Sequence, residues 1–289
     1  MADFTIVPTG RFSLQESVEF GFGQRHAERF DGVMRLAFCL DDFTGQVGVV
    51  LRQDAAGVHG EIVGAVRDPQ AVRAQVARML SLDREASGFA EVGLRDPVIG
   101  ALQAAAPGLL PPLFHSPYEA AVWSVLSARR PALQMAKVRD QLAAQHGRVF
   151  DLAGKKVAAL PTPAQLLEVT EFPGIPAEKL ARLHGVARAA LDGLLDVERL
   201  QRLGPQVAIT EVQRIKGIGP FYASLIVIRA VGFTDVLPAD EPLARDLVTR
   251  LYGLDHPCEP ADLERIAEPW KPYRTWATVL IRAAGQRIL

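Results

Sequence analysis

The sequence predicts a mostly helical protein, in which a small α+β domain with an antiparallel sheet is followed by a larger all-α region. Three observations lead to this fold class. Runs rich in β-branched residues are confined to the first third, helical apolar spacing begins near residue 68, and prolines and glycines then divide the chain into short helical segments. A chain of 289 residues can form one large domain or two ordinary ones. We predict an N-terminal domain over residues 1–75 and a helical region over residues 76–289.

The predicted strands lie near the N-terminus. Phe4, Ile6 and the runs VMRLAFCL (33–40) and QVGVVLRQD (46–54) are rich in residues that favour strands. Turn-forming residues such as Asp41-Asp42 separate them. We therefore expect a small antiparallel sheet here and no strand further along the chain.

The helical pattern begins at Asp68-Pro69, where Asp68 can cap a helix whose first residue is Pro69. Beyond it, apolar spacing and the Pro and Gly breaks predict a series of helices. They lie at about 97–105, 117–129, 132–146, 163–170, 177–193, 210–216, 220–231, 241–252, 261–269 and 272–285.

Composition excludes several classes of protein. The net charge of −1 argues against a globally basic polyanion binder, so any nucleic-acid site must be a local patch or a backbone-amide site. The only cysteines, Cys39 and Cys258, cannot hold a four-thiolate iron–sulfur cluster or a four-cysteine zinc, and we expect buried, reduced thiols. The six histidines lack metal-binding spacing. No secretory leader or membrane-spanning run is visible, which favours a cytoplasmic protein.

One turn carries the strongest local signal. Thr210-Glu-Val-Gln213 matches a capping box and predicts a helix that starts at Thr210, and Pro220 starts a second helix that Gly232 ends. Between them, Gly217 and Gly219 permit a sharp turn and leave backbone N–H groups able to bind an anion. From spacing alone, a plain helical corner and an anion site are equally good interpretations.

The surrounding motifs extend this signal. The run VQRIKGIGPFYASLI (212–226), the acid in LPAD (237–240) and the tail WKPYRTWA (270–277) occur in this order. With YEAAVWSVLS (118–127) and RMLSLD (78–83), they resemble the helix-hairpin-helix DNA glycosylase superfamily, and most of all its 3-methyladenine DNA glycosylase II branch. The resemblance covers roughly residues 70–289. It implies a two-lobed helical domain with the active site between the lobes.

The resemblance also implies how DNA is held. In this family the amides of the hairpin bind a phosphate, and a monovalent cation such as Na⁺ or K⁺ can bind its carbonyls. The matching amides are those of Gly217, Gly219 and Ala223. The matching carbonyls are those of Gln213, Ile215 and Ile218. Such a site would bind duplex DNA without a basic isoelectric point.

Asp240 matches the catalytic acid of the family. Cleavage of an N-glycosidic bond develops positive charge on the sugar, which a nearby carboxylate stabilises. An alkylated purine is already cationic and leaves without a strong acid, so one carboxylate is enough. The competing interpretation of Asp240 is an N-cap of the next helix, and Glu241 and Asp246 are expected to face solvent.

The base pocket is predicted from aromatic residues. Bifunctional members of the superfamily place a lysine two residues after the second hairpin glycine, whereas this chain has Phe221 there and Lys216 before the turn. We therefore expect a monofunctional enzyme without lyase activity. An aromatic face suits a cationic base. The pocket candidates are Phe221, Trp276 and Tyr273, with Phe12, Phe20 and Phe22 as weaker ones.

Two positions depart from the family pattern. Where members carry Gln and an apolar wedge, this chain reads Ala128-Arg-Arg-Pro131, so Arg129 is either a residue of the DNA gap or a phosphate ligand. Arg282 replaces a frequent aromatic, and it either lies on the surface or pairs with Asp240.

These implications describe a monomeric, monofunctional DNA glycosylase of the bacterial nucleoid. It would flip alkylated purines such as 3-methyladenine and 7-methylguanine out of damaged double-stranded DNA and hydrolyse their glycosidic bonds in base excision repair. Two alternatives stay open. One is a non-catalytic helix-hairpin-helix protein that binds DNA or senses damage, and the other is a glycosylase for hypoxanthine, uracil or an oxidised guanine.

Overall fold

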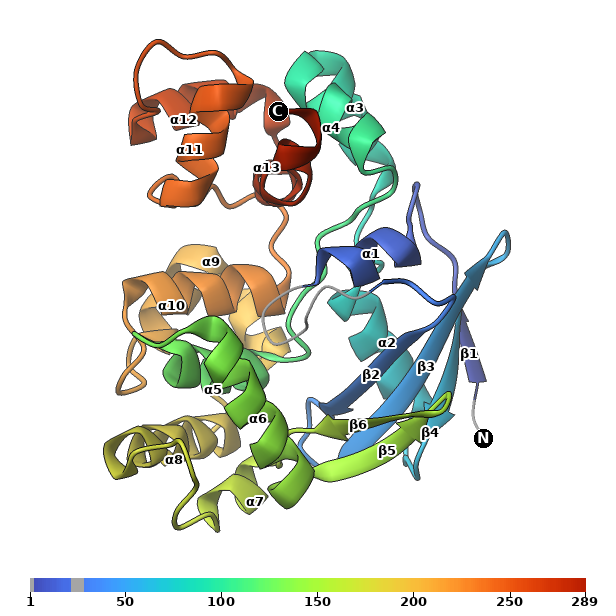
Figure 1. Cartoon of the computed structure of the whole chain (residues 1–289), viewed down its shortest axis with the longest axis vertical. Helices are drawn as coiled ribbons and strands as arrows, with labels where there is room; N and C mark the ends of the chain where they lie inside the picture. Colours follow the sequence, from blue (N-terminus) through green and yellow to red (C-terminus); the bar gives the residue numbers. More distant parts are fainter. Residues whose placement is uncertain (1–2, 22–28) are drawn as a thin grey trace.

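The computed structural model describes residues 3–21 and 29–289 (Figure 1). It contains a four-stranded antiparallel sheet with strand order β1-β4-β3-β2 near the N-terminus. The strands are β1 (Asp3–Ile6), β2 (Met34–Cys39), β3 (Gln46–Asp54) and β4 (Gly57–Val63). The predicted small antiparallel sheet is therefore confirmed.

The two faces of this sheet are covered by different elements. Helix α2 (Pro69–Met79), capped by the Asp68 side chain as predicted, packs on one face together with α1 (Leu14–Phe20). The other face is covered by a β-hairpin of β5 (Arg148–Leu152) and β6 (Lys155–Ala159). This hairpin corrects the expectation of no strand beyond the sheet. Its inward side chains are stabilised by contact with the sheet, which the local sequence does not reveal.

Helices make up the rest of the chain. They are α3 (Ser87–Arg95), α4 (Pro97–Ala105), α5 (Pro117–Ser127), α6 (Ala132–His146), α7 (Pro163–Leu167), α8 (Ala177–Leu191), α9 (Val197–Val212), α10 (Pro220–Ile226), the π-helical turn η1 (Val227–Val231), α11 (Pro242–Leu251), α12 (Pro260–Ile266), the 3₁₀ turn η2 (Glu268–Trp270) and α13 (Arg274–Ile288). Most agree with the predicted segments within a few residues. Thr210 does not: it lies inside α9, which is kinked at Gly204, so the predicted helix start there is wrong. The Thr210 hydroxyl donates to the Gln206 carbonyl instead of capping.

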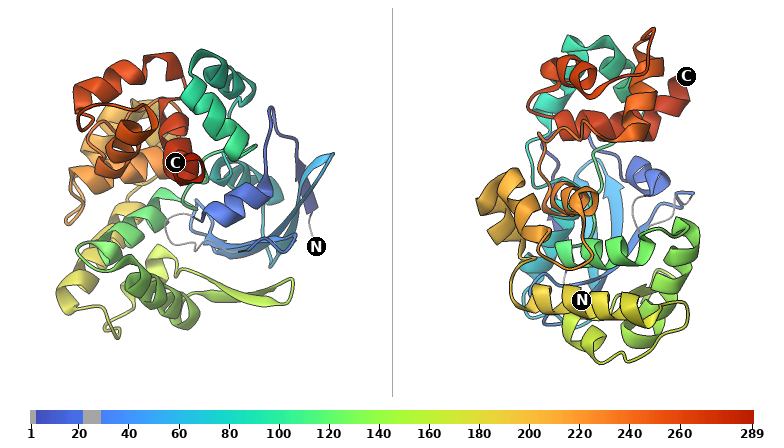
Figure 2. Two further views of the ribbon diagram at one scale, coloured as in Figure 1. Left: turned by 45° about the horizontal axis from the view of Figure 1, so that its top comes forward. Right: turned by 90° about the vertical axis from the view of Figure 1, so that its left-hand side faces the viewer.

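The helices form two lobes (Figures 1 and 2). In one lobe, α3 and α4 pack beside α11, α12 and α13 from the far end of the sequence, and this lobe shares a continuous apolar core with the sheet. The other lobe, α5 to α10, has its own core. Two segments, residues 106–116 and 232–241, connect the lobes. The predicted domain boundary at residue 75 falls inside α2, and the two-domain division stays a prediction. Among residues 3–21 and 29–289, no helix has the length and apolar character needed to cross a bilayer.

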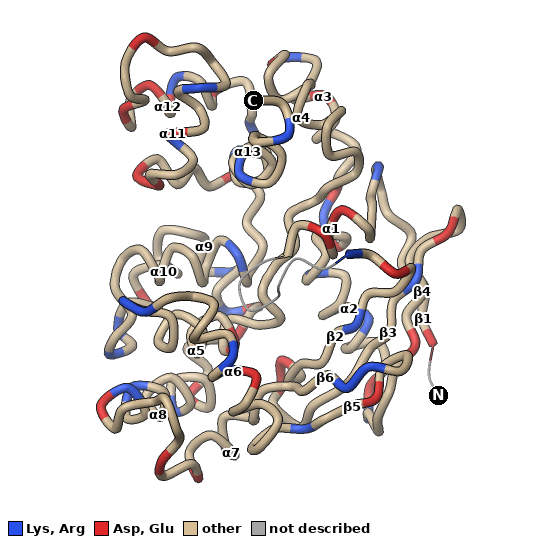
Figure 3. Tube along the Cα trace, in the orientation of Figure 1, with Lys and Arg blue, Asp and Glu red and all other residues tan. Residues whose placement is uncertain are grey.

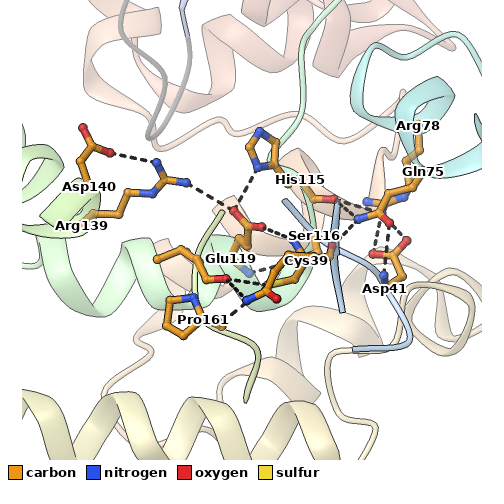
Figure 4. A network of polar contacts seen from close by, with 12 residues as sticks. Cys39, Asp41, Gln75, Arg78, His115, Ser116, Glu119, Arg139, Asp140 and Pro161 are labelled. Carbon is orange, nitrogen blue, oxygen red and sulfur yellow. Dashed lines mark hydrogen bonds and ion pairs between the residues drawn. The ribbon is translucent and has the colours of Figure 1, made fainter. Parts of the chain in front are cut away.

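A buried polar network lies where the lobes and the sheet meet (Figure 4). The guanidinium of Arg78 donates to the Asp41 carboxylate at 2.6 Å and to the backbone carbonyls of Ala230 at 2.7 Å and His115 at 3.2 Å. Its side chain is almost fully buried. One cation therefore joins α2 to the end of the sheet, to the connecting segment 106–116 and to the end of the π turn.

A second buried charge lies beside it. The carboxylate of Glu119, on α5, accepts from the Cys39 amide at 3.1 Å and from His115 Nδ1 at 3.0 Å, and it lies 3.7 Å from Arg139 Nη2. Burial alone would raise the pKa of Glu119, but the charge and hydrogen bond of His115, with the charge of Arg139, hold it below its ordinary value. Cys39 and Cys258 are both buried free thiols, as predicted.

We predict that Glu119→Ala destabilises the protein by about 3–5 kcal/mol, because it leaves buried donors and a buried guanidinium without their carboxylate. Asp140→Ala is the matched control, since Asp140 binds the same Arg139 but is half exposed, and it should cost about 0–1 kcal/mol. Urea denaturation of both variants measures the difference. Equal losses in the free energy of unfolding would show that the buried network stabilises the protein no more than the exposed ion pair does.

Candidate functional site

The turn between α9 and α10 is held by buried isoleucines on one side and exposed to solvent on the other. Ile215 and Ile218 are buried in the core of the second lobe, and the Ile218 amide donates to the Ile215 carbonyl at 3.0 Å. Gly217 and Gly219 alternate with them and are exposed. Within the described part of the chain, neither glycine amide donates a hydrogen bond to the protein. The turn therefore offers two backbone donors to solvent from a fixed position.

The two glycines serve different purposes. Gly217 has φ +97°, a conformation that residues with side chains rarely adopt, and an added Cβ would lie 3.0 Å from Arg182 Cδ. Gly219 has φ −84°, and an added Cβ would meet no atom within 4 Å. Gly217 is thus needed for the turn itself, whereas Gly219 keeps the space above the turn free.

The third predicted amide ligand differs from these. Ala223 is buried, and its N–H donates to the Gly219 carbonyl at 2.9 Å as part of the first turn of α10. Its assignment to DNA binding stays a prediction, since the amide is already used. Of the predicted cation ligands Gln213, Ile215 and Ile218, the Ile215 carbonyl accepts the Ile218 amide and has a lone pair left.

A local basic patch borders the turn. Because the net charge of the chain is only −1, any attraction for an anion must come from such a local group of charges. Burial and the charges of Arg130 and Arg182 lower the pKa of Lys179, whose ammonium donates to the Leu126 carbonyl at 2.7 Å. Arg182 also lies against Gly217. Lys and Arg are frequent on the side of the second lobe that carries this turn: before α6, on α8 and at the α9–α10 turn itself (Figure 3). The sequence indicated only Arg129 here, which is exposed at the α5–α6 turn with φ +55°.

Asp240 lies on the segment that leaves the hairpin's second helix and crosses to the first lobe (Figure 1). It is exposed and belongs to a turn closed by the bond from the Glu241 amide to the Pro238 carbonyl, 3.0 Å. The N-cap of α11 is Glu241, whose carboxylate accepts the Ala244 amide at 2.8 Å. The capping role considered for Asp240 is therefore wrong, and so is the expectation that Glu241 faces solvent. Asp246 is exposed, as predicted.

Arg282 pairs with the neighbour of the acid. Its Nε lies 3.8 Å from Glu241 Oε2, so this arginine does not form the ion pair with Asp240 that was one of its two interpretations. Further back along the segment, Asp235 accepts from Arg274 Nε at 2.7 Å and from Arg274 Nη2 at 3.0 Å. This bond raises the pKa of Arg274 above its ordinary value. Neither Asp235 nor the pairing of Arg274 was anticipated, although Arg274 lies in the tail motif.

The predicted aromatic pocket is not assembled in this structure. Phe221 is 61% exposed and meets the edge of Tyr222, with ring centroids 5.3 Å apart. Trp276 and Tyr273 are 2% and 8% exposed and pack against Phe89 in the core of the first lobe. A base can reach Phe221 directly, whereas the other two rings are enclosed, and their pocket role stays a prediction. The weaker candidates Phe12 and Phe20 pack on the same core, and Phe22 lies outside the described residues.

Enclosed cavities and metal clusters do not define this site. A cavity of about 720 Å³ lies between α1, β2, α6 and the β5–β6 hairpin, and it is not lined by Asp240 or Phe221. Residues 3–21 and 29–289 contain no group of His, Cys, Asp and Glu arranged to hold a metal ion. The candidate site residues are instead exposed groups: the glycine turn, the basic side chains beside it, Phe221 and Asp240.

Comparison with known proteins identifies relatives of one kind. No family model matches the sequence. A DNA-3-methyladenine glycosylase of Bacillus subtilis is 24% identical over 209 residues, which cover 68% of this chain and 66% of the relative. DNA-3-methyladenine glycosylase 2 of Escherichia coli is 29% identical over 193 residues (63% of each), and a probable bifunctional transcriptional activator/DNA repair enzyme AlkA of Mycobacterium tuberculosis is 29% identical over 215 residues (73% and 42%). The chain thus spans less than two thirds of the length of these relatives.

Solved structures agree on the fold. The 3-methyladenine DNA glycosylase of Archaeoglobus fulgidus superposes with a TM-score of 0.79 at 19% identity, covering 100% of this chain and 99% of that one. An 8-oxoguanine glycosylase/lyase of Clostridium acetobutylicum, in complex with double-stranded DNA, gives 0.64 at 16% identity over 96% and 93%. The fold is that of the helix-hairpin-helix DNA glycosylases. Within that class, the sequence relatives confirm the resemblance to the 3-methyladenine DNA glycosylase II, or AlkA-like, branch.

Proposed function

We propose that this protein is a monofunctional DNA glycosylase that removes alkylated purines, of the 3-methyladenine and 7-methylguanine kind, from duplex DNA in base excision repair at the nucleoid. One observation carries the proposal. The exposed glycine turn begins α10, and the segment that follows this helix and its π turn carries the exposed carboxylate of Asp240. The turn that would bind a phosphate thus begins a partly buried helical element, and the segment that follows this element carries the acid that would stabilise positive charge.

DNA binding is attributed to the turn and its basic edge. The amides of Gly217 and Gly219 donate to a backbone phosphate, and the nearby Lys179, Arg130 and Arg182 attract the duplex despite the net charge of −1. A Na⁺ or K⁺ ion held by the carbonyls of the turn would add one more positive charge beside that phosphate, since carbonyl oxygens suit such hard cations.

The chemistry needs one carboxylate. As the bond between C1′ and the base nitrogen breaks, its electron pair leaves with the base, and positive charge develops on the sugar. Asp240 stabilises that charge and accepts the proton of the water that attacks C1′. An alkylated purine leaves as a neutral base because it was cationic beforehand. Asp240 is exposed in the free protein, so the bound duplex itself excludes bulk solvent from it and leaves only the attacking water.

Base recognition is attributed first to Phe221. The alkylated purine is flipped out of the stack, and its positive charge is attracted to the face of the exposed phenyl ring. Arg129, on the exposed turn before α6, fills the gap left in the duplex or holds a flanking phosphate.

We predict that Asp240→Asn lowers base release from methylated duplex DNA by about 1,000-fold, since the oxocarbenium-like sugar loses its counter-charge. Affinity for an abasic duplex should stay within a factor of about two. Released bases are identified by chromatography, which also reports the lesions accepted. Asp246→Asn, which changes another exposed carboxylate on α11, is the control and should retain the wild-type rate. Near-wild-type release by the Asp240 variant would favour a non-catalytic role for this acid, and no release by wild type would favour a DNA-binding or sensing protein.

We predict that Gly219→Val weakens binding to an abasic duplex by about tenfold or more at only a modest cost in stability, because the added side chain has free space in the protein but occupies the approach of the phosphate. Gly217→Ala is the comparison. It forces a side chain into φ +97° and costs about 1–2 kcal/mol of stability. Unchanged affinity of a folded Gly219→Val variant would show that the turn is only a structural corner between two helices and does not bind phosphate.

We predict that the product strand carries intact abasic sites and that borohydride traps no covalent complex. A lyase needs an amine that can attack C1′ from the start of α10, where this chain has Phe221. Lys179 is bonded to the Leu126 carbonyl at 2.7 Å, and Lys271 pairs with Glu268 at 2.9 Å. Denaturing gels before and after alkali treatment test the strand. A trapped adduct on any lysine, most directly on Lys216 beside the turn, would show a bifunctional enzyme.

A further inference from the structure

The segment that carries Asp240 is held at its start by the first turn of α13. The Arg274 guanidinium donates twice to the Asp235 carboxylate and once to the Asp235 carbonyl, at 3.2 Å. The Thr275 amide donates to the Thr234 carbonyl at 2.9 Å, and the Thr275 hydroxyl bonds both backbone groups of Val236, at 2.8 and 2.9 Å. Residues 234–236 are therefore fixed to the helix through backbone and side chain.

The same helix holds the segment again at its end. Arg282 lies 3.8 Å from Glu241, the residue after Asp240 and the N-cap of α11. Arg282 comes eight residues after Arg274 in α13, which places it about 12 Å further along the helix axis. Between the two ties lie only residues 237–240, of which Leu237 packs on the core of the first lobe. Asp240 thus lies between two points at which the segment contacts α13.

Helix α13 is a rigid support because its core contacts do not depend on these ties. Trp276, Leu280, Ile281 and Ala284 are buried in the first lobe, and the helix packs along α4. At its C-terminal end, Arg287 pairs with Glu16 of α1 at 2.8 Å and donates to the Ala105 carbonyl. Loss of one partly exposed arginine should therefore leave the helix in place.

We propose that Arg274 is a positioning residue for the carboxylate of Asp240, with Arg282 in the same role at the other end of the segment. The proposal rests on the proposed catalytic role of Asp240. The bidentate bond from Arg274 fixes the distance and direction at which the segment leaves α13, and lysine, a point charge without the planar fork, reproduces this only in part. Because Asp240 is exposed and in a turn, few other contacts would hold it within reach of C1′.

The test compares Arg274→Ala, Arg274→Lys and Arg282→Ala with Arg287→Ala, the control that removes an arginine ion pair from the same helix without touching the segment. Single-turnover base release is measured on methylated duplex with enzyme in excess, together with affinity for an abasic duplex. A displacement of about 1 Å at a reacting group can cost about 100-fold in rate. We expect about a 30- to 100-fold loss for Arg274→Ala, a smaller loss for Arg282→Ala, partial recovery in Arg274→Lys, and affinities within a factor of about two throughout.

A second readout does not depend on catalysis. Amide hydrogen exchange of the peptide over residues 234–241 should be faster in Arg274→Ala than in wild type and unchanged in Arg287→Ala. The bonds of Arg274 and Thr275 to residues 234–236 protect the Val236 amide, which donates to Thr275 Oγ1. All variants are assayed at a temperature where each is folded by circular dichroism. If Arg274→Ala fails to fold, Arg274→Lys against wild type decides by both readouts.

The outcomes separate this inference from the proposed function. If Asp240→Asn loses base release while Arg274→Ala matches Arg287→Ala in rate and exchange, the acid is catalytic and the positioning role is wrong. If rate and DNA affinity fall together with unchanged exchange, the arginine acts on binding and the positioning role is again wrong. If Asp240→Asn keeps base release, the catalytic assignment fails, and the inference fails with it.

Discussion

The bond from the buried Arg78 guanidinium to the Ala230 carbonyl is the contact on which the arrangement of the site depends. It holds the end of the π turn at the place where the sheet, the connecting segment 106–116 and the second lobe meet. The neighbouring Arg229 strengthens the junction, since its carbonyl accepts the Phe114 amide at 2.8 Å and its guanidinium donates to the Pro112 carbonyl at 2.8 Å. Gly232 follows in a left-handed conformation and turns the chain toward the first lobe. The direction in which the acid segment leaves is therefore set by buried polar groups.

This junction explains how two lobes with separate cores present one surface. The glycine turn and Phe221 belong to the second lobe, while α11 and α13 belong to the first. The connecting segment is short, and it is tied to Arg78 through the π turn at one end and to α13 through Asp235 at the other. A rotation of the lobes would change the distance from the glycine turn to Asp240. The buried Glu119 network beside Arg78 opposes such a rotation because it also bridges the sheet and the second lobe.

Local chemistry decided what the sequence could predict. Asp68, Pro69, Pro220, Gly217 and Gly232 act on their own backbone neighbourhood, so their roles followed from residue type and spacing. The hairpin β5–β6, the continuation of α9 through Thr210 and the enclosure of Trp276 depend on partners distant in sequence. The same holds for the pairs of Arg78 with Asp41, Arg274 with Asp235 and Arg282 with Glu241, which join residues 37, 39 and 41 positions apart. Arg78 and Arg274 lie in motifs that the sequence analysis singled out, but no local pattern identifies their partners.

The exposure of Asp240 is consistent with the kind of substrate that one acid can serve. A carboxylate kept in water costs nothing in desolvation. Under the proposed function, the field of this carboxylate is screened by water until the duplex covers it, so catalysis would be coupled to DNA binding at the glycine turn and the basic side chains beside it. A neutral base would need an additional proton donor at the leaving group, whereas a cationic alkylpurine needs only the counter-charge and a water molecule. Under the proposed function, a single acid would favour substrates whose bond is already weakened, which makes positioning of the acid more important than the number of groups around it.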